Sequence, residues 1–305
     1  MKIGGGLIGV GVAAWAFAYT AQPSPHEQRP VLRSITSSVA VHVLVSNERG
    51  AVRGLTASDF VLTDSGIRQD IATMTVDPLP LDVTVVLEQL QQSEYASRDR
   101  HPHVEEVEQL LDAGDRLRLL SVGTDVLELV PLSAPGSAAD AKPPTPSDVG
   151  SVYDGLASAL MRPSAVGRQH VIVVVSEAYD AMSFTSPESL MELAERSDAQ
   201  VHLLMAEGRR IKSRTLARLP VPAVRDDGLE LLVTLARATG GNYIQPSRLT
   251  RSIREPVRRL LDEVRAGYVL YYSPKGVPEG GWHPITVTIS RPGPFEVRAR
   301  PGYAN

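Results

Sequence analysis

Two carboxylates stand directly after the most apolar stretches of this sequence. Glu88 follows the run Asp82–Leu87, and Glu177 follows the run His170–Ser176. Both runs are short and rich in β-branched residues, which is typical of strands buried on both faces of a parallel sheet. Because ligands bind to open α/β sheets at the carboxyl ends of the strands, we expect both acids to lie where chemistry or binding takes place.

Two serines accompany these acids. Ser151 precedes an amphipathic segment and is the predicted N-cap of a helix over 152–161. Ser176 ends its strand as the nucleophile of a hydrolase would, but Val174 and Ala178 stand where a nucleophile elbow has glycines, so the sharp turn is not predicted. Two glutamates close together without a cation repel each other, and we therefore expect a raised pKa for one of them.

The elements that position these side chains follow from the alternation of strands and amphipathic helices between Asp82 and Gln245. This alternation predicts an α/β fold, with a mainly parallel sheet covered by helices on both faces. The expected strands are 82–87, 117–122, 170–176, 200–206 and 242–245, with 125–130 as an antiparallel edge. The expected helices are 103–112, 152–161, 186–196, 228–239 and 247–265. Pro256 should kink the last helix or mark its start, with Arg254 and Glu255 outside it.

The segments on either side of this region read as strands that do not alternate with helices. The expected strands are 38–46, 60–63, 68–75 and 268–273, followed by a terminal hairpin of 282–290 and 295–300. Asp64–Gly66 is a hairpin turn signal between the second and third of them. We expect the leading and terminal segments to pair with each other in one small accessory β-sheet.

Composition excludes several classes of function. The chain has 305 residues, a net charge of −4 and 5% aromatic residues, so it lacks the basic and aromatic surface of a nucleic-acid-binding protein. It contains no cysteine, which excludes disulfides, thiolate metal sites and a cysteine nucleophile. The seven histidines show no spacing typical of metal ligands. We expect no cofactor and no catalytic residue.

The N-terminal segment indicates export. One lysine is followed by an uncharged, apolar run and by small residues near Ala18–Ala21, which is the pattern of a secretory signal. The run is also long enough to serve as an uncleaved signal anchor through residues 3–21. We therefore expect a periplasmic or extracellular protein, with anchoring in the inner membrane as the alternative.

Short motifs spread over the chain carry a resemblance to a known family. They are Gly54–Phe60, Asp64–Gly66, Leu81–Leu87, Asp115–Leu117, Ser151–Gly155, Val171–Ser176, Ala238–Gly241, Tyr268–Pro274 and Val297–Tyr303. In their order and spacing, the chain from about residue 34 to its end resembles the von Willebrand factor A-related proteins abundant in acidobacteria. The resemblance implies a Rossmann-like, doubly wound sheet. It divides the chain into a signal or anchor (1–21), a linker (22–33), an accessory β unit (34–79), the von Willebrand factor A-like domain (80–266) and strands returning to the accessory unit (267–305).

The same resemblance implies a metal-ion-dependent adhesion site and shows how this chain departs from it. The family has Asp-x-Ser-x-Ser after the first strand, and these positions fall here on Glu88, Leu90 and Gln92. The threonine position falls on Ser151, and the later aspartate position falls on Glu177. Because Mg²⁺ requires oxygen ligands in a nearly octahedral array, a leucine and two lengthened acids predict a degenerate site. We expect no metal there; weak Mg²⁺ or Mn²⁺ binding at an altered site is the alternative.

These inferences predict an exported adhesion or scaffold-type module that binds an unknown protein partner and no nucleic acid. The expected ligand-binding residues are Glu88, Gln92, Ser151 and Glu177, assisted by the loop Glu207–Asp227, whose basic cluster could contact a partner. The rivals are cation-dependent ligand binding at the same residues and a hydrolase that uses Ser176 or the paired glutamates. A structural role in an envelope assembly is a further alternative.

Overall fold

The structure is a computed structural model of the chain. It describes residues 38–75, 77–89, 102–136, 138, 141–142, 144–147, 149–163, 165–178, 180–205, 227–244 and 252–304. Contacts divide the chain into Met1–Thr36 and Ser37–Asn305, and the description below concerns the second unit. The predicted signal and linker, Gln92 and nearly all of the loop Glu207–Asp227 lie outside the described residues.

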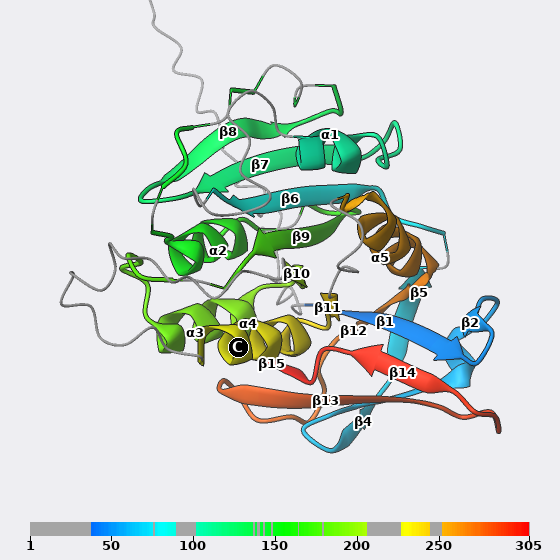
Figure 1. Ribbon diagram of the computed structural model, residues 1–305. Helices are drawn as coiled ribbons and strands as arrows, with labels where there is room; N and C mark the ends of the chain where they lie inside the picture. Colours follow the sequence, from blue (N-terminus) through cyan, green and yellow to red (C-terminus); the bar gives the residue numbers. More distant parts are fainter. Residues whose placement is uncertain are drawn as a thin grey trace, which may run out of the picture. The chain divides into compact units, whose positions relative to one another are not determined.

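The center of this unit is a six-stranded, mainly parallel sheet, as the alternating pattern predicts (Figure 1). Its strand order is β11-β10-β9-β6-β7-β8. Only the pair β7–β8 is antiparallel, at the edge where the sequence places it. The bounds are β6 (Leu81–Glu88), β7 (Arg116–Val122), β8 (Val126–Ser133), β9 (Gln169–Ser176), β10 (Gln200–Met205) and β11 (Tyr243–Ile244).

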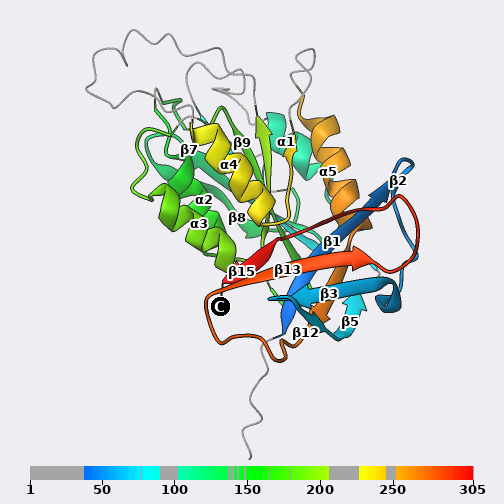
Figure 2. The same cartoon turned by 90° about the horizontal axis from the view of Figure 1, so that it is seen from below.

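Helices cover both faces of this sheet (Figure 2). Apolar residues of α1 (Pro102–Glu108) and α5 (Arg254–Ala266) pack on the face that carries Val83, Val85 and Leu87. The opposite face, with Val86, is covered by α2 (Val152–Leu160), α3 (Pro187–Arg196) and α4 (Asp227–Ala238). Central strands buried on both faces explain the continuous apolar runs in the sequence. Nowhere in the described part of the chain is a helix long and apolar enough to cross a membrane.

The leading and terminal segments pair with each other, but they build two antiparallel sheets where we expected one. The first has the order β14-β1-β12-β5 with β2 beside β1, and the second has the order β15-β13-β3-β4. A separate apolar core is formed by residues of both sheets. The bounds are β1 (Val39–Asn47), β2 (Gly50–Ala51), the 3-10 turn η1 (Ala57–Asp59), β3 (Phe60–Asp64), β4 (Ile67–Gln69), β5 (Ile71–Thr75), β12 (Tyr268–Tyr272), β13 (Trp282–Ile289), β14 (Glu296–Ala299) and β15 (Gly302–Ala304).

Two local predictions are wrong for one reason. The expected strand 68–75 is interrupted at Asp70, so that β4 pairs with β3 while β5 pairs with β12 of the other sheet. The expected terminal hairpin does not form, because β13 pairs with β3 whereas β14 pairs with β1. In both places the chain crosses between sheets, and a local alternation of apolar residues does not show which partner a strand will take.

Helix α5 corrects the prediction for Pro256. The helix begins at Arg254 and includes Glu255, with Ile253 as its N-cap. Pro256 therefore lies in the first turn, where a backbone N–H has no acceptor within the helix and its loss costs little. The part of the expected helix before residue 252 lies outside the described residues.

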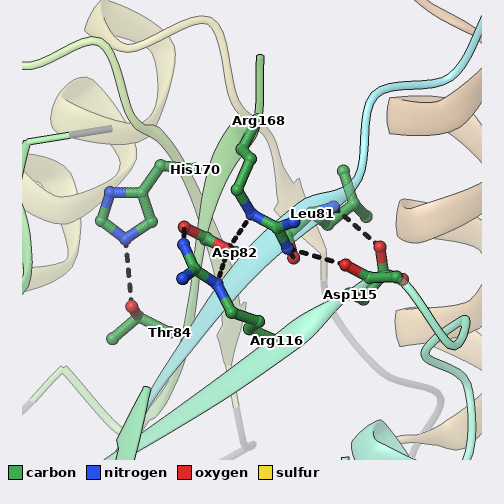
Figure 3. A network of polar contacts seen from close by, with 8 residues as sticks. Leu81, Asp82, Thr84, Asp115, Arg116, Arg168 and His170 are labelled. Carbon is green, nitrogen blue, oxygen red and sulfur yellow. Dashed lines mark hydrogen bonds and ion pairs between the residues drawn. The ribbon is translucent and has the colours of Figure 1, made fainter. Parts of the chain in front are cut away.

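Ion pairs fix the starts of the central strands, at the edge opposite to Glu88 (Figure 3). Asp82 accepts hydrogen bonds from Arg116 Nε (2.8 Å) and from Arg168 Nε (2.6 Å). Arg168 also donates to the carbonyl oxygen of Leu81, and Asp115 accepts from the backbone N–H of Leu81. Because three neighbouring strands are tied together at their amino ends, their carboxyl ends are held in a fixed register.

Candidate functional site

Glu88 and Ser176 occupy adjacent positions at the carboxyl tips of β6 and β9. Because Leu87 pairs with Val175 in the sheet register, the next residue of each strand lies beside the other. Glu88 Oε2 accepts a hydrogen bond from Ser176 Oγ at 2.7 Å and another from the backbone N–H of Glu177 at 2.8 Å. The predicted meeting of Glu88 and Glu177 is thus present, but Glu177 reaches Glu88 through its backbone.

The carboxyl group of Glu88 is buried, with 3% of the residue exposed. Burial raises the pKa of Glu88 to about 8, against the hydrogen bonds from Ser176 and Glu177, and the charges of Glu177 and Asp180 add to the increase. At neutral pH this group therefore carries a proton. The pKa of one glutamate is thus shifted in the expected direction, although loss of hydration rather than repulsion is the main cause. Among the described residues, Glu88 Oε1 has no hydrogen-bond partner.

Ser151 stands at the predicted N-cap position of α2 but does not cap the helix. Its hydroxyl donates to the carbonyl oxygen of Gly123 at 2.9 Å, and no hydrogen bond joins its side chain to the first turn of α2. Two residues of the β9–α3 connection supply the caps. Asp180 Oδ2 accepts from the N–H of Tyr153 at 2.8 Å, and Ser183 Oγ accepts from the N–H of Asp154 at 3.1 Å.

The β9–α3 connection is in turn held by α2. Asp154 Oδ2 accepts from the N–H of Phe184 at 3.0 Å, and Asp154 Oδ1 accepts from the N–H of Thr185 at 2.8 Å. Asp180 also accepts from the hydroxyl of Ser183 at 2.6 Å. The sequence analysis missed Asp154 and Asp180. An acid in the first turn of a predicted helix was the available signal for Asp154, but its partners lie about thirty residues away in the chain.

Strand β9 ends at Ser176 in a tighter turn than the sequence predicts. Ala178 has a φ of 57°, a left-handed conformation that is uncommon for a residue other than glycine, so the absence of glycine did not exclude a sharp turn. Ser176 is nevertheless buried, its hydroxyl donates to Glu88, and it accepts from the N–H of Ala178 at 2.8 Å. Its hydrogen bonds are made with a carboxyl group and a backbone amide, whereas a serine nucleophile needs a general base such as histidine.

The described side chains at this edge are not grouped as the ligands of a hard cation must be. One oxygen of Glu88 is engaged by two donors, and the hydroxyl of Ser151 points to a carbonyl group of the β7–β8 turn. Within the described ranges, no group of three or more His, Asp or Glu residues is arranged to hold a metal ion. Positions 90 and 92 lie outside those ranges. The described residues therefore do not fit the divalent ion that the family resemblance implies.

No family model and no curated protein matches this chain. Among solved structures, a von Willebrand factor type A protein from Catenulispora acidiphila aligns at 9% identity and a TM-score of 0.44, covering 80% of this chain and 73% of that one. BatB from Bacteroides thetaiotaomicron aligns at 12% identity and 0.40, covering 60% and 98%. Manganese-loaded TRAP from Plasmodium vivax aligns at 11% identity and 0.41, covering 79% and 97%. Similarity at this level supports no argument about function.

Proposed function

We propose that this chain is a von Willebrand factor A-like module that binds a protein partner at the carboxyl edge of its parallel sheet, without a metal ion and without catalysis. The observation that carries the proposal is the arrangement around Glu88. The buried carboxyl group of Glu88 accepts hydrogen bonds from the neighbouring strand tip, at the position where the family would have a cation ligand.

The family assignment is supported by the architecture together with the sequence motifs. A sheet ordered β11-β10-β9-β6-β7-β8, with one antiparallel edge strand and helices on both faces, agrees with the fold that the resemblance implies. We extend the assignment to the acidobacterial type with a degenerate adhesion site. The terminal segments, which build the two antiparallel sheets, then belong to the accessory unit of that type.

Protein binding is supported by the construction of the edge. Asp154 and Asp180 hold the β9–α3 connection against α2, so hydrogen bonds within the chain order this surface. Such a surface binds by complementarity of shape and charge, with little ordering cost.

The proposal is tested by photo-cross-linking in the cells that produce the protein. A photoreactive amino acid is placed at position 177 or 188, which flank the connection, and at position 67 in β4 as a control. We expect the same cross-linked protein from both positions of the edge, in the presence of EDTA, and none from position 67. Equal cross-linking from all three positions, or from position 67 alone, would contradict the proposal.

The metal-dependent rival makes a different prediction for calorimetric titration with Mg²⁺ and Mn²⁺. Micromolar binding that is lost in Glu177→Ala would replace the metal-free proposal. The hydrolase rival has less support, because the hydroxyl of Ser176 is buried and bonded to Glu88. Hydrolysis of an ester probe that disappears in Ser176→Ala would restore it.

Export belongs to the same proposal. The uncharged, apolar N-terminal run supports action outside the cytoplasm, in the periplasm or beyond, either after release from a signal peptide or with an anchor through residues 3–21. The N-terminal sequence of the mature protein distinguishes these forms. A start near residue 22 indicates cleavage, and an intact N-terminus in the membrane fraction indicates an anchor.

A further inference from the structure

Phe184 is fully exposed, at 100%, on the connection between β9 and α3, and Met182 beside it is 46% exposed. Single exposed apolar residues are common on protein surfaces and do not by themselves mark a binding site. Phe184 differs because hydrogen bonds fix the backbone that carries it. Its own N–H and that of Thr185 donate to the two carboxylate oxygens of Asp154.

Further contacts hold the rest of the connection. The N–H groups of Ala181 and Met182 both donate to the carbonyl oxygen of Gly150, at 3.0 and 3.1 Å. Ser183 is bound to Asp180 through both its N–H and its hydroxyl. An aromatic side chain on a backbone that is already ordered loses little conformational entropy when it is buried by a partner, which is what a binding hot spot requires.

The chain segment that carries Phe184 is acidic in sequence. Between residues 169 and 195 the sequence has no lysine or arginine and carries five acids, which are Glu177, Asp180, Glu188, Glu192 and Glu195. Glu188 and Glu192 lie one helical turn apart on α3 and are exposed. Acids in this segment favour a partner with a basic surface over an anionic membrane.

We propose that Phe184 is the anchor of the binding edge, and that the partner is a protein with an apolar pocket for this ring and basic side chains around the pocket. This inference rests on the proposed function and specifies the partner's chemistry. Met182 extends the apolar contact, and the acids of α3 contribute to attraction and orientation.

The test uses the full chain as bait for a random peptide library displayed on phage. We expect enriched peptides that combine aliphatic or aromatic residues with lysine or arginine. Their binding should weaken about thirty-fold in Phe184→Ala, which corresponds to about 2 kcal/mol. It should also weaken at high salt and in Glu192→Lys.

Met161→Ala is the matched control, because Met161 is 64% exposed at the opposite end of α2, where it forms the C-cap. Peptide binding should be unchanged in this variant. The melting temperature of Phe184→Ala should equal that of the wild type because the ring makes no buried contacts, so loss of binding will not reflect loss of the fold.

Three results would overturn the inference. Enriched peptides that bind Phe184→Ala as tightly as the wild type would show that the anchor lies elsewhere. A dimer that Phe184→Ala dissociates in sedimentation would identify a second copy of this chain as the occupant. Binding to phosphatidylglycerol vesicles through Phe184 would identify a lipid surface. If cross-linking at positions 177 and 188 succeeds while peptide binding ignores Phe184, the proposed function stands and only this inference fails.

Discussion

Replacing Glu88 by glutamine should remove a pH-dependent loss of stability from this protein. Burial raises the pKa of Glu88 to about 8, from an ordinary value of 4.5. Between these two pH values the folded state holds a proton that the unfolded state releases. The contribution of Glu88 to the unfolding free energy is fully present below about pH 4.5. It is lost as the pH rises through about 8, after which both states are ionised and the loss is complete.

The magnitude follows from this window. Between about pH 5.5 and about pH 7.5, the folded protein should lose about 2.5 kcal/mol of unfolding free energy from Glu88 alone, because the loss is about 1.4 kcal/mol per pH unit while the proton counts differ by one. Glutamine does not ionise, and its amide oxygen can accept the hydrogen bonds of Ser176 Oγ and the N–H of Glu177 in place of Oε2.

Urea denaturation followed by circular dichroism at several pH values measures this effect, with EDTA in every buffer. The informative quantity is the unfolding free energy of Glu88→Gln minus that of the wild type, because the other titrating groups contribute equally to both proteins. The difference should rise with pH across the window and level off above about pH 8. A difference that is flat or that falls would refute the assignment of a buried, protonated Glu88.

Three further substitutions test the buried polar groups. His202→Leu should leave stability at pH 7 unchanged or increased, because both ring nitrogens lack partners among the described residues. Burial lowers the pKa of His202 to about 3. The wild type should therefore lose stability from this group as the pH falls below about 6.5, and the variant should not. Asp64→Asn should cost about 2 kcal/mol of unfolding free energy, because this fully buried carboxyl group accepts hydrogen bonds from two tyrosine hydroxyls and contacts a histidine. Asp70 is exposed, and Asp70→Asn, the control, should have no measurable cost. Asp82→Asn should cost about 3 kcal/mol, because it leaves two partly buried arginines without their carboxylate.

Each of these results has a clear contrary outcome. An acid-stability profile of His202→Leu that superimposes on the wild type would show that this imidazole does not titrate as a buried group. Equal denaturation midpoints for Asp64→Asn and Asp70→Asn would show that the Asp64 contacts contribute no net stability. A cost below about 1 kcal/mol for Asp82→Asn would place that ion pair among weak surface pairs.

The sequence by itself determined the elements whose signals are local. Val83–Leu87 is a nearly continuous apolar run and Val171–Val175 a continuous one; both predict strands buried on both faces, and the structure places both at the center of the sheet. Ser186 followed by Pro187 predicted the start of α3, and the hydroxyl of Ser186 accepts from the N–H of Ser189 there. A carboxylate directly after a strand in an α/β pattern was enough to direct attention to Glu88.

Only the tertiary structure decided which strands pair and which donors each carboxylate receives. The break at Asp70 sends neighbouring residues into different sheets, and Asp180 rather than Ser151 caps α2 from a distant part of the chain. The burial that raises the pKa of Glu88 likewise comes from elements that converge on it in space. Periodicity and capping are recorded in consecutive residues, whereas pairing, hydration and hydrogen bonding depend on contacts between residues far apart in the chain, and these exist only after the whole fold has formed.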